Sequence, residues 1–278
     1  SSTDFSEILD GLYDNKVVPY LGPGALFDAT NKQTGAPMPA DSNRLILAMN
    51  NGNPMAPKLM YEFPRAAMNQ ELKRGRNFLG QFLTKLYGET EYTRAAVHDW
   101  LAEWRPAYVI DINRDTQLQD TYSDEEHTLI VGVARISASQ FRFKIYHFDG
   151  SDYFEIPQEQ VDHRFPILFK PMGTPRPEAN YIASDADYVD YITELMGGFA
   201  IPDFLKEYRK GKQYLFIGVP LNRDSERMVM SDIVYGAAEK KGWVLNKNPT
   251  DKEIRYCKKI GLEILDVDVE ELLATVLV

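Results

Sequence analysis

Two glycines near the start of the chain have the spacing of a phosphate-binding loop. Residues 17–21 form a short apolar run that predicts a buried strand, and Gly22, Pro23 and Gly24 follow it directly. Glycines at a strand end let backbone N–H groups approach a phosphate, whose charge a helix N-terminus also favours. The third glycine of the dinucleotide fingerprint is absent, because Phe27 stands at its position. The motif is therefore compatible both with a phosphate site and with an ordinary tight turn.

Other predicted strands also end in residues that suit a ligand. Asn113 and Asp115 follow the second strand, Gly173 follows the third and Gly218 follows the fourth. In open α/β sheets, ligands bind outside the carboxyl ends of the strands, so these loops should lie together. The Asn113 amide can bond a ribose hydroxyl, and the Asp115 carboxylate can hold a loop or a water. One such loop would indicate only a turn, but several at one sheet edge favour a ligand site.

The chain is poor in the side chains that usually carry acid–base, thiol or zinc chemistry. Its one cysteine, Cys257, excludes a disulfide framework and a zinc site built on several thiolates. Of the four histidines, His98 is expected on a helix and His163 at the amino end of a strand. His127 and His147 belong to a β segment that could fold over the site. No histidine is an obvious general base from its position.

Alternating helices and strands must position these loops. Apolar residues at helical spacing predict a first helix at about 5–13, and Ser184 with Asp187 forms a capping-box pattern before a later one. This alternation favours a Rossmann-like, doubly wound parallel sheet of the α/β class. The other predicted helices cover about 71–87, 91–104, 184–196, 202–210, 223–240 and 268–276, and the predicted strands cover 17–21, 107–112, 166–170, 214–217, 243–245 and 262–267.

Two segments interrupt the alternation. Residues 28–70 lack periodicity and are rich in Asn, Pro, Gly and Met, so we expect an irregular and helical insertion at about 28–90. Residues 120–160 carry β-branched and aromatic runs, and those at 141–148 and 153–156 flank Asp149-Gly150, a hairpin signal. The prediction is a single domain, 1–278, with an inserted helical segment and a small β excursion.

Composition excludes several classes of partner. The 278 residues include 31 Lys and Arg and 41 Asp and Glu, for a net charge of −10, which disfavours nucleic acid. At 44% hydrophobic and 12% aromatic, the chain can bury a core. No stretch has the length and apolarity of a membrane span, and no signal peptide begins the sequence. We therefore expect a cytoplasmic protein without nucleic-acid or membrane partners.

Several short motifs follow one another along nearly the whole chain, from about residue 8 to 276. They are Leu-Gly-Pro-Gly-Ala-Leu at 21–26, Gly-Ala-Pro at 35–37, Asp-Ile-Asn-Arg-Asp at 111–115, Lys-Pro-Met-Gly at 170–173, Asp-Tyr at 187–188 and Leu-Phe-Ile-Gly-Val-Pro-Leu at 215–221. In order and spacing they resemble the motifs of sirtuin-like (Sir2-like) proteins. The resemblance is closer to the bacterial Sir2-like branch than to the histone-deacylase branch.

The resemblance implies a Rossmann-like sheet that binds NAD or a related adenine dinucleotide. Gly22, Gly24 and Ala25 would line the pyrophosphate. The nicotinamide-side ribose would lie near Asn113 and Asp115, and the adenosine near Gly218 and the loop after Val267. The predicted cofactor-binding residues are Gly22, Pro23, Gly24, Ala25, Leu26, Asn113, Asp115, Met172, Gly173, Gly218, Val219 and Val267.

The departures from the family pattern concern its chemistry. Met172 stands where the family has its catalytic histidine, and a thioether cannot serve as a general base at neutral pH. Leu26 replaces a serine, Ile112 replaces a threonine, and Met38-Pro39 replaces an aromatic-Arg pair. A single cysteine cannot form the four-cysteine zinc module, so we predict no zinc and no deacylase activity.

Three functional hypotheses follow. The first is a nucleotide-binding pseudoenzyme that acts as a sensor or accessory protein, its partner being a small-molecule nucleotide. The second is an NAD glycohydrolase in which Asn113 and Asp115 are the catalytic residues. The third is a scaffold with a decayed site that binds a protein partner. A homo-oligomer is compatible with each of them.

Overall fold

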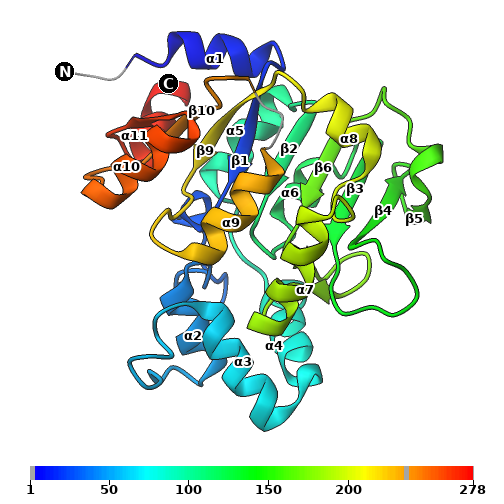
Figure 1. The fold of residues 1–278 in the computed structure, drawn as a ribbon, viewed down its shortest axis with the longest axis vertical. Coiled ribbons are helices and arrows are strands. Elements are labelled where there is room, and N and C mark those ends of the chain that lie inside the picture. The colour runs from blue at the N-terminus through cyan, green and yellow to red at the C-terminus, as the bar shows by residue number, and fades with distance from the viewer. Residues whose placement is uncertain (1–3, 235–237, 278) are drawn as a thin grey trace.

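One large sheet forms the centre of the protein. The computed structural model describes residues 4–234 and 238–277. Its strands are Val17–Leu21 (β1), Tyr108–Asp111 (β2), His127–Gly132 (β3), Phe143–Phe148 (β4), Tyr153–Ile156 (β5), Ile167–Lys170 (β6), Gly173–Thr174 (β7), Asn180–Tyr181 (β8), Gln213–Ile217 (β9), Gly242–Leu245 (β10) and Leu262–Leu265 (β11). Within the described residues, nine of them form a sheet in the order β11-β10-β9-β1-β2-β6-β3-β4-β5, with β7 and β8 as a separate pair (Figure 1).

The order of the strands places a topological switch at β1. In the sheet, β2, β6 and β3 lie on one side of β1, and β9, β10 and β11, which come later in the chain, lie on the other side, all in parallel. This confirms the predicted doubly wound α/β fold. Pro19 is tolerated in this central strand because pairing of β1 with β2 begins only at Tyr20. In such sheets the crevice beyond the strand ends at the switch is where ligands bind.

Helices cover both faces of the sheet. They are Ser6–Tyr13 (α1), Ser42–Met49 (α2), Phe63–Arg74 (α3), Arg76–Gly88 (α4), Ala96–Trp104 (α5), Gln117–Thr121 (α6), Asp185–Met196 (α7), Asp203–Tyr208 (α8), Asp224–Ile233 (α9), Asp251–Ile260 (α10) and Val269–Val276 (α11). Helices α7, α8 and α9 pack on one face, whereas α1, α5, α6 and α11 pack on the other. Along β1, Val18 and Tyr20 join the first core and Val17 and Leu21 the second, because successive side chains alternate.

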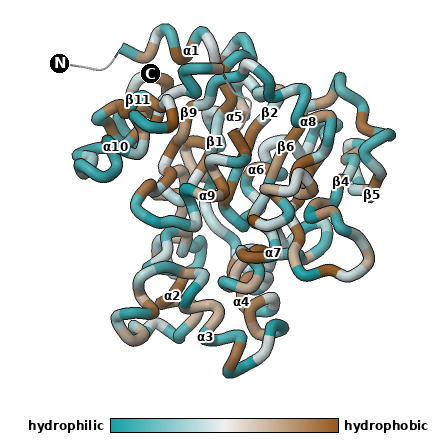
Figure 2. Tube along the Cα trace, in the orientation of Figure 1, coloured by the Kyte–Doolittle hydropathy of each residue, from teal (hydrophilic) through white to brown (hydrophobic). Residues whose placement is uncertain are grey.

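A separate small core holds the inserted helical segment together. Helices α2, α3 and α4 share a hydrophobic cluster that includes Ile46, Phe63 and Leu83, and they gather at one end of the molecule (Figure 1). Figure 2 shows hydrophobic residues within these helices, while the outer helix α10 is mostly hydrophilic. Leu26, from the loop after β1, belongs to the same cluster and ties the insertion to the sheet edge.

Several helix boundaries differ from those predicted. The predicted helix at 71–87 is two helices, because the chain turns at Gly75 with a φ of 89° between α3 and α4. The helix predicted at 91–104 begins only at Ala96. The one predicted at 223–240 ends at Ile233; residues 235–237 lie outside the described part, and 238–240 are not helical.

Helices α2, α6 and α10 were not predicted individually. Helix α10 lies between β10 and β11, and it starts with a capping box in which Thr250 and Glu253 bond each other's backbone N–H groups. The same signal predicted α7 correctly, where Ser184 and Asp187 form the box. The strand after α10 ends at Leu265, two residues before the predicted boundary.

The predicted hairpin extends the edge of the sheet. Strands β4 and β5 pair antiparallel around Asp149 and Gly150, where Asp149 accepts backbone N–H bonds and Gly150 has a φ of 104°. Strand β3 pairs with β4 on one side and runs parallel to β6 on the other, so it belongs to the main sheet.

No helix in the described ranges combines the length and apolarity needed to cross a membrane.

Candidate functional site

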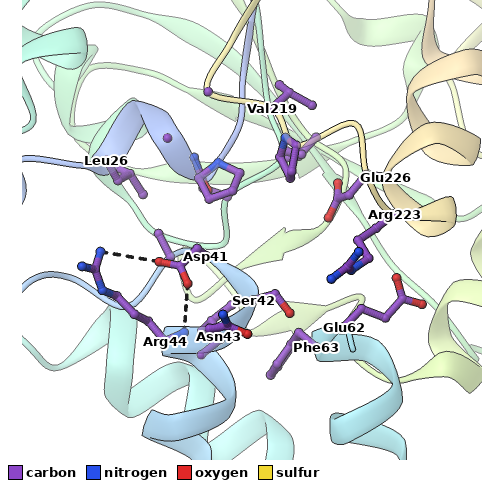
Figure 3. A pocket seen from close by; sticks show the side chains of 18 of the residues that line it. Leu26, Asp41, Ser42, Asn43, Arg44, Glu62, Phe63, Val219, Arg223 and Glu226 are labelled. Carbon is purple, nitrogen blue, oxygen red and sulfur yellow. Dashed lines mark hydrogen bonds and ion pairs between the residues drawn. The ribbon is translucent and has the colours of Figure 1, made fainter. Parts of the chain in front are cut away.

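A pocket lies at the topological switch, beyond the carboxyl ends of β1, β2 and β9. Its volume is about 480 Å³, within the range of small-molecule sites. One wall is the sheet edge, and the facing wall is the inserted segment (Figure 3). Of the predicted cofactor-binding residues, those that line it are Pro23, Gly24, Leu26, Asn113, Gly218 and Val219.

The glycine loop packs tightly against the loop after β9. A Cβ on Gly24 would lie 2.6 Å from the Cα of Gly218, and one on Gly22 would lie 2.5 Å from the carbonyl oxygen of Gly218. The N–H of Gly24 donates to Gly218 O at 2.9 Å, and that of Ala25 donates to Gly22 O at 3.0 Å. These glycines therefore permit contact between two loops, and their N–H groups are already used within the protein. A phosphate needs other donors.

Asn113 joins the second strand to the glycine loop. Its side-chain amide donates to Gly22 O at 2.8 Å, and its backbone N–H donates to the Asp111 carboxylate at 3.0 Å. The side chain is buried and also lines the pocket. Asn113 thus holds the sheet edge in place while its amide borders the cavity.

Arg114, next to Asn113, supplies the most deeply buried positive charge of the pocket wall. The side chain is only 8% exposed, and its Nε and Nη2 donate to Ile182 O at 2.9 and 2.6 Å. Nη2 also contacts the Tyr188 hydroxyl at 3.1 Å, and the guanidinium lies over the ring of Phe63. Within the described residues no carboxylate forms an ion pair with it. A buried guanidinium bonded only to neutral groups is a suitable donor for an anionic ligand.

The inserted segment contributes the first turn of α2. The Asp41 carboxylate caps the helix by accepting the Arg44 N–H at 2.9 Å and lies 3.5 Å from the Arg44 guanidinium (Figure 3). The Ser42 hydroxyl oxygen is buried and has no hydrogen-bond partner among the described residues. Both Asp41 and Ser42 line the pocket, which therefore offers an unsatisfied hydroxyl to a ligand.

The start of α3 closes the pocket against the start of α9. The Arg223 Nε donates to Tyr61 O at 2.6 Å, and its guanidinium lies 4.2 Å from the centre of the Tyr61 ring. The Ser225 hydroxyl donates to the Glu62 carboxylate at 3.0 Å. These contacts connect the insertion to the second half of the sheet, so residues from 61 to 64 form a wall of the pocket.

Glu226 is a carboxylate of this pocket without a close partner. It lies in the first turn of α9, and no hydrogen bond or ion pair joins it to a described residue (Figure 3). Burial raises the pKa of Glu226 to about 7, although the positive charge of Arg114 works in the opposite direction and the negative charge of Glu62 adds to the rise. Near neutral pH this group can therefore both donate and accept hydrogen bonds.

Asp115, predicted to face the ligand, lies under the sheet edge and not among the pocket-lining residues. It is 1% exposed, its Oδ1 lies 3.6 Å from Lys170 Nζ, and its Oδ2 accepts the Gln117 N–H at 3.1 Å. Lys170 also bonds Asp111 at 2.9 Å. Burial raises the pKa of Asp111. This buried charge cluster supports the loop that carries Asn113.

The other predicted residues contact the rest of the protein and do not line the pocket. Met172 is buried, and its carbonyl accepts the Ile182 N–H at 2.9 Å. Gly173 pairs with Tyr181 in the β7–β8 hairpin. The predicted residues that do not line the pocket are Gly22, Ala25, Asp115, Met172, Gly173 and Val267.

None of the four histidines lines the pocket. His98 is fully buried on α5, and burial lowers its pKa to about 3. His127 bonds the Tyr153 hydroxyl, and His147 lies 3.2 Å from the Glu126 carboxylate, both in the hairpin region. His163 packs its ring edge-on against Phe204. No histidine stands in for the base that position 172 lacks.

Sequence reasoning missed most of the residues that line the pocket. Arg114 sits between the two residues singled out after the second strand, and Glu226 lies in the first turn of the helix after Gly218. Both positions follow from the rule that strand-end loops and helix starts face the ligand. The missed pocket residues from the insertion, which showed no periodicity, include Asp41, Ser42, Asn43, Arg44, Tyr61, Glu62 and Phe63.

Comparison with known families agrees with this architecture. The family model described as SIR2-like domain matches residues 107–265, which is more than half of the chain. The chain belongs to the SIR2-like family. The matched part of this SIR2-like protein begins before β2 and ends with β11, and so includes Asn113, Arg114, Gly218 and Glu226 but not the glycine loop. No curated protein matches the chain.

The zinc module of deacylases was predicted to be absent from this SIR2-like protein. Among residues 4–234 and 238–277, no three His, Cys, Asp or Glu side chains are grouped so as to hold a metal ion. Cys257 is buried on α10, and burial raises the pKa of its thiol to about 11. The absence of zinc stays a prediction.

Proposed function

We propose that the pocket binds NAD, ADP-ribose or a related adenine dinucleotide, and that the protein acts as a sensor or accessory protein without deacylase activity. The observation that carries the proposal is the position of Arg114 in a pocket at the topological switch. A buried cation with no carboxylate contact in the described residues favours a ligand that brings negative charge. Family membership makes an NAD-related ligand the first choice.

The residues present fit such a ligand chemically. Arg114 would hold the pyrophosphate, since the N–H groups of the glycine loop are used within the protein. The Ser42 hydroxyl and the Glu226 carboxyl would bond sugar hydroxyls, because both lack partners in the described chain. The rings of Tyr61 and Phe63 offer apolar surface to a base.

The lack of deacylase activity follows from the lack of the family's histidine base. Met172 is buried away from the pocket, and no histidine lines it. The glycohydrolase hypothesis named Asn113 and Asp115, of which only Asn113 borders the cavity. We therefore expect no nicotinamide release when the purified protein is incubated with NAD and the products are separated by chromatography. Steady release across the neutral pH range would favour the hydrolase instead.

Thermal unfolding with NAD, ADP-ribose, FAD and FMN tests the binding itself. A ligand at about 100 times its dissociation constant stabilises the folded state by about 2.7 kcal/mol, which raises the melting temperature measurably. We expect a shift with NAD or ADP-ribose. Arg114→Met should weaken ADP-ribose binding by about tenfold or more. Arg164→Met is the matched control, because Arg164 is exposed, forms an ion pair with Asp162 and does not line the pocket. If no nucleotide shifts the melting temperature, the proposal is wrong and the scaffold hypothesis gains.

A further inference from the structure

The charges of this protein are unevenly distributed along its sequence. Residues 239–259 hold seven of the 31 Lys and Arg but only three of the 41 Asp and Glu, so this segment is positive in a chain whose net charge is −10. Helix α10 lies in this segment and connects β10 to β11, the strand at one end of the sheet. We define the basic patch as the four exposed cations of this helix, Lys252, Arg255, Lys258 and Lys259.

The cations of the basic patch are not used within the protein. Within residues 4–234 and 238–277, no ion pair or side-chain hydrogen bond engages any of the four. The inner side of α10 holds the helix on the sheet, because Cys257 is buried in the first core and Tyr256 and Ile260 pack against that core. Ile254 is 45% exposed. The outer face of α10 therefore presents positive charge without a partner, next to exposed apolar surface.

The opposite end of the sheet is acidic. Strand β5 is the last strand of the sheet and, among the described strands, pairs only with β4. Residues 149–160, which include β5, contain no Lys or Arg. Lys144 on β4 lies 4.0 Å from the Glu155 carboxylate but is closer, at 3.1 Å, to that of Glu178. Phe154 is 52% exposed. We define the acidic patch as the four exposed carboxylates of this segment, Asp149, Asp152, Glu155 and Glu159.

The two patches cannot meet within one copy of the protein. Figure 1 shows α10 at the left of the molecule and β5 at the right, with the sheet between them. Neighbouring strands lie about 4.8 Å apart, so a sheet of this size is about 40 Å wide. The basic patch can therefore contact the acidic patch only of another copy.

The overall negative charge of the protein does not prevent such a contact. Salt screens exposed charges beyond a Debye length of about 8 Å at physiological ionic strength. Each patch in a contact therefore interacts with the opposite charges facing it more strongly than with distant charges of the partner. Complementary patches also favour one orientation of the two copies over the others.

We propose that copies of this protein associate head to tail, with the basic patch of one copy docked on the acidic patch of the next. Because the two surfaces differ, the interface is heterologous, and it generates a ring or an open chain of copies. Ile254 and Phe154 supply apolar surface that the contact removes from water. Neither patch lines the nucleotide pocket, so the inference does not depend on the proposed function.

Sedimentation velocity of the full chain without ligand tests this association. At about 50 mM salt, the weight-average mass of the wild type should rise with protein concentration between about 1 and about 100 μM. At about 500 mM salt the rise should be much smaller, because the charges are screened. A wild-type mass that stays that of a single chain at low salt would overturn the proposal.

Two charge-reversal variants locate the interface. The basic-patch variant carries Arg255→Glu, Lys258→Glu and Lys259→Glu, and the acidic-patch variant carries Asp152→Lys, Glu155→Lys and Glu159→Lys. Each should weaken self-association by about tenfold or more, because like charges then face each other. Melting curves establish that each variant is folded. Unchanged association of either folded variant would show that its patch is not part of the interface, and the proposal would be wrong.

An equimolar mixture of the two variants is the decisive measurement. The reversed helix of the first variant is acidic and matches the reversed strand segment of the second, and their unaltered patches match each other as well. The mixture should therefore associate to within about threefold of the wild type, although neither variant does so alone. Failure of the mixture to associate would contradict the pairing of these two patches.

The control reverses three exposed lysines outside the basic patch, with Lys32→Glu, Lys58→Glu and Lys73→Glu. It changes the net charge as much as the basic-patch variant does, so its association should stay close to that of the wild type. A loss as large as that of the basic-patch variant would show that net charge alone is responsible. Binding of the wild type to phosphatidylserine vesicles without any self-association would assign the basic patch to an anionic membrane, and would likewise overturn the proposal.

Discussion

Glu226 brings a titratable group to a pocket whose expected catalytic base is missing. The carboxyl is partly buried in the first turn of α9, and its pKa of about 7 places its ionisation in the neutral range. Arg114, from the loop after β2, and Glu62, from the start of α3, influence the pKa of Glu226. The charge of Glu226 in turn raises the pKa of Tyr20 on β1 and of Tyr188 on α7. Arg114 favours the ionised form, and burial together with Glu62 favours the protonated form.

This titration predicts that the binding of ADP-ribose depends on pH. Below a pH of about 7, Glu226 is protonated and neutral; above it, the ionised carboxylate repels the negatively charged pyrophosphate of a ligand in the pocket. The dissociation constant of ADP-ribose should therefore rise several-fold between about pH 6 and about pH 8. Titrations of wild type and Glu226→Gln at both values check it. An equal rise in both proteins would contradict the assignment to Glu226.

At the scale of elements, the loops after β1 and β9 behave as one unit. Gly24 and Gly218 approach each other through their backbones, and Gly218 has a φ of 69°, which favours glycine. Hydrogen bonds from Gly22 and Gly24 to residues 217 and 218 fasten the loops together. Glycine at these positions allows the two loops to pack together at the switch point, and this packing in turn gives a ligand access to the pocket.

Gly24→Ala should therefore destabilise the protein without any ligand present. The added Cβ would lie 2.6 Å from the Cα of Gly218, and overpacking of this kind costs about 1–3 kcal/mol in the free energy of unfolding. Gly80→Ala is the matched control. No atom lies within 4 Å of its Cβ position inside α4, so alanine should stabilise the helix by about 0.5–1 kcal/mol. Urea unfolding measures both. A Gly24→Ala protein as stable as the wild type would show that the two loops can separate at little cost in the free energy of unfolding.

At the scale of the whole molecule, acid stability depends on a histidine far from the pocket. His98 is fully buried on α5, and neither ring nitrogen bonds a described residue. Burial lowers its pKa to about 3, with Arg94 and Lys170 acting in the same direction and Asp115 opposing them. In the unfolded chain the pKa returns to about 6.5. As pH falls below that value, only the unfolded state binds the proton, and stability declines by about 1.4 kcal/mol per pH unit.

His98→Leu should remove this contribution. Above a pH of about 6.5 the variant should be as stable as the wild type or about 1 kcal/mol more stable, because an unpaired polar group leaves the core. Between about pH 6 and about pH 4 its stability should fall less steeply. Urea unfolding across this range measures the slopes, with His163→Gln as the control, since His163 is exposed. Parallel slopes for wild type and His98→Leu would show that His98 does not set the acid stability.

Local patterns in the sequence determined which elements exist and where most of them lie. Periodicity in α1, the capping box before α7 and the Asp149-Gly150 turn act over a few residues, so they could be predicted without the fold. The alternation of strands and helices likewise determined the parallel sheet. The local signal around Gly75 was mixed, so the boundary between α3 and α4 was missed. The capping signal at Thr250 was overlooked, so α10 was missed.

The residues that face the ligand were decided only by the tertiary structure. Asn113 and Asp115 are two positions apart and equally polar, yet one borders the cavity and the other pairs with Lys170 beneath it. Glu62 reaches Ser225 across more than half the chain. The spacing of residues along the chain predicts which backbone segments end at the sheet edge, because the formation of a strand depends on neighbouring residues in the sequence. Which side chains meet there depends on how distant segments pack, and that information lies in the fold as a whole.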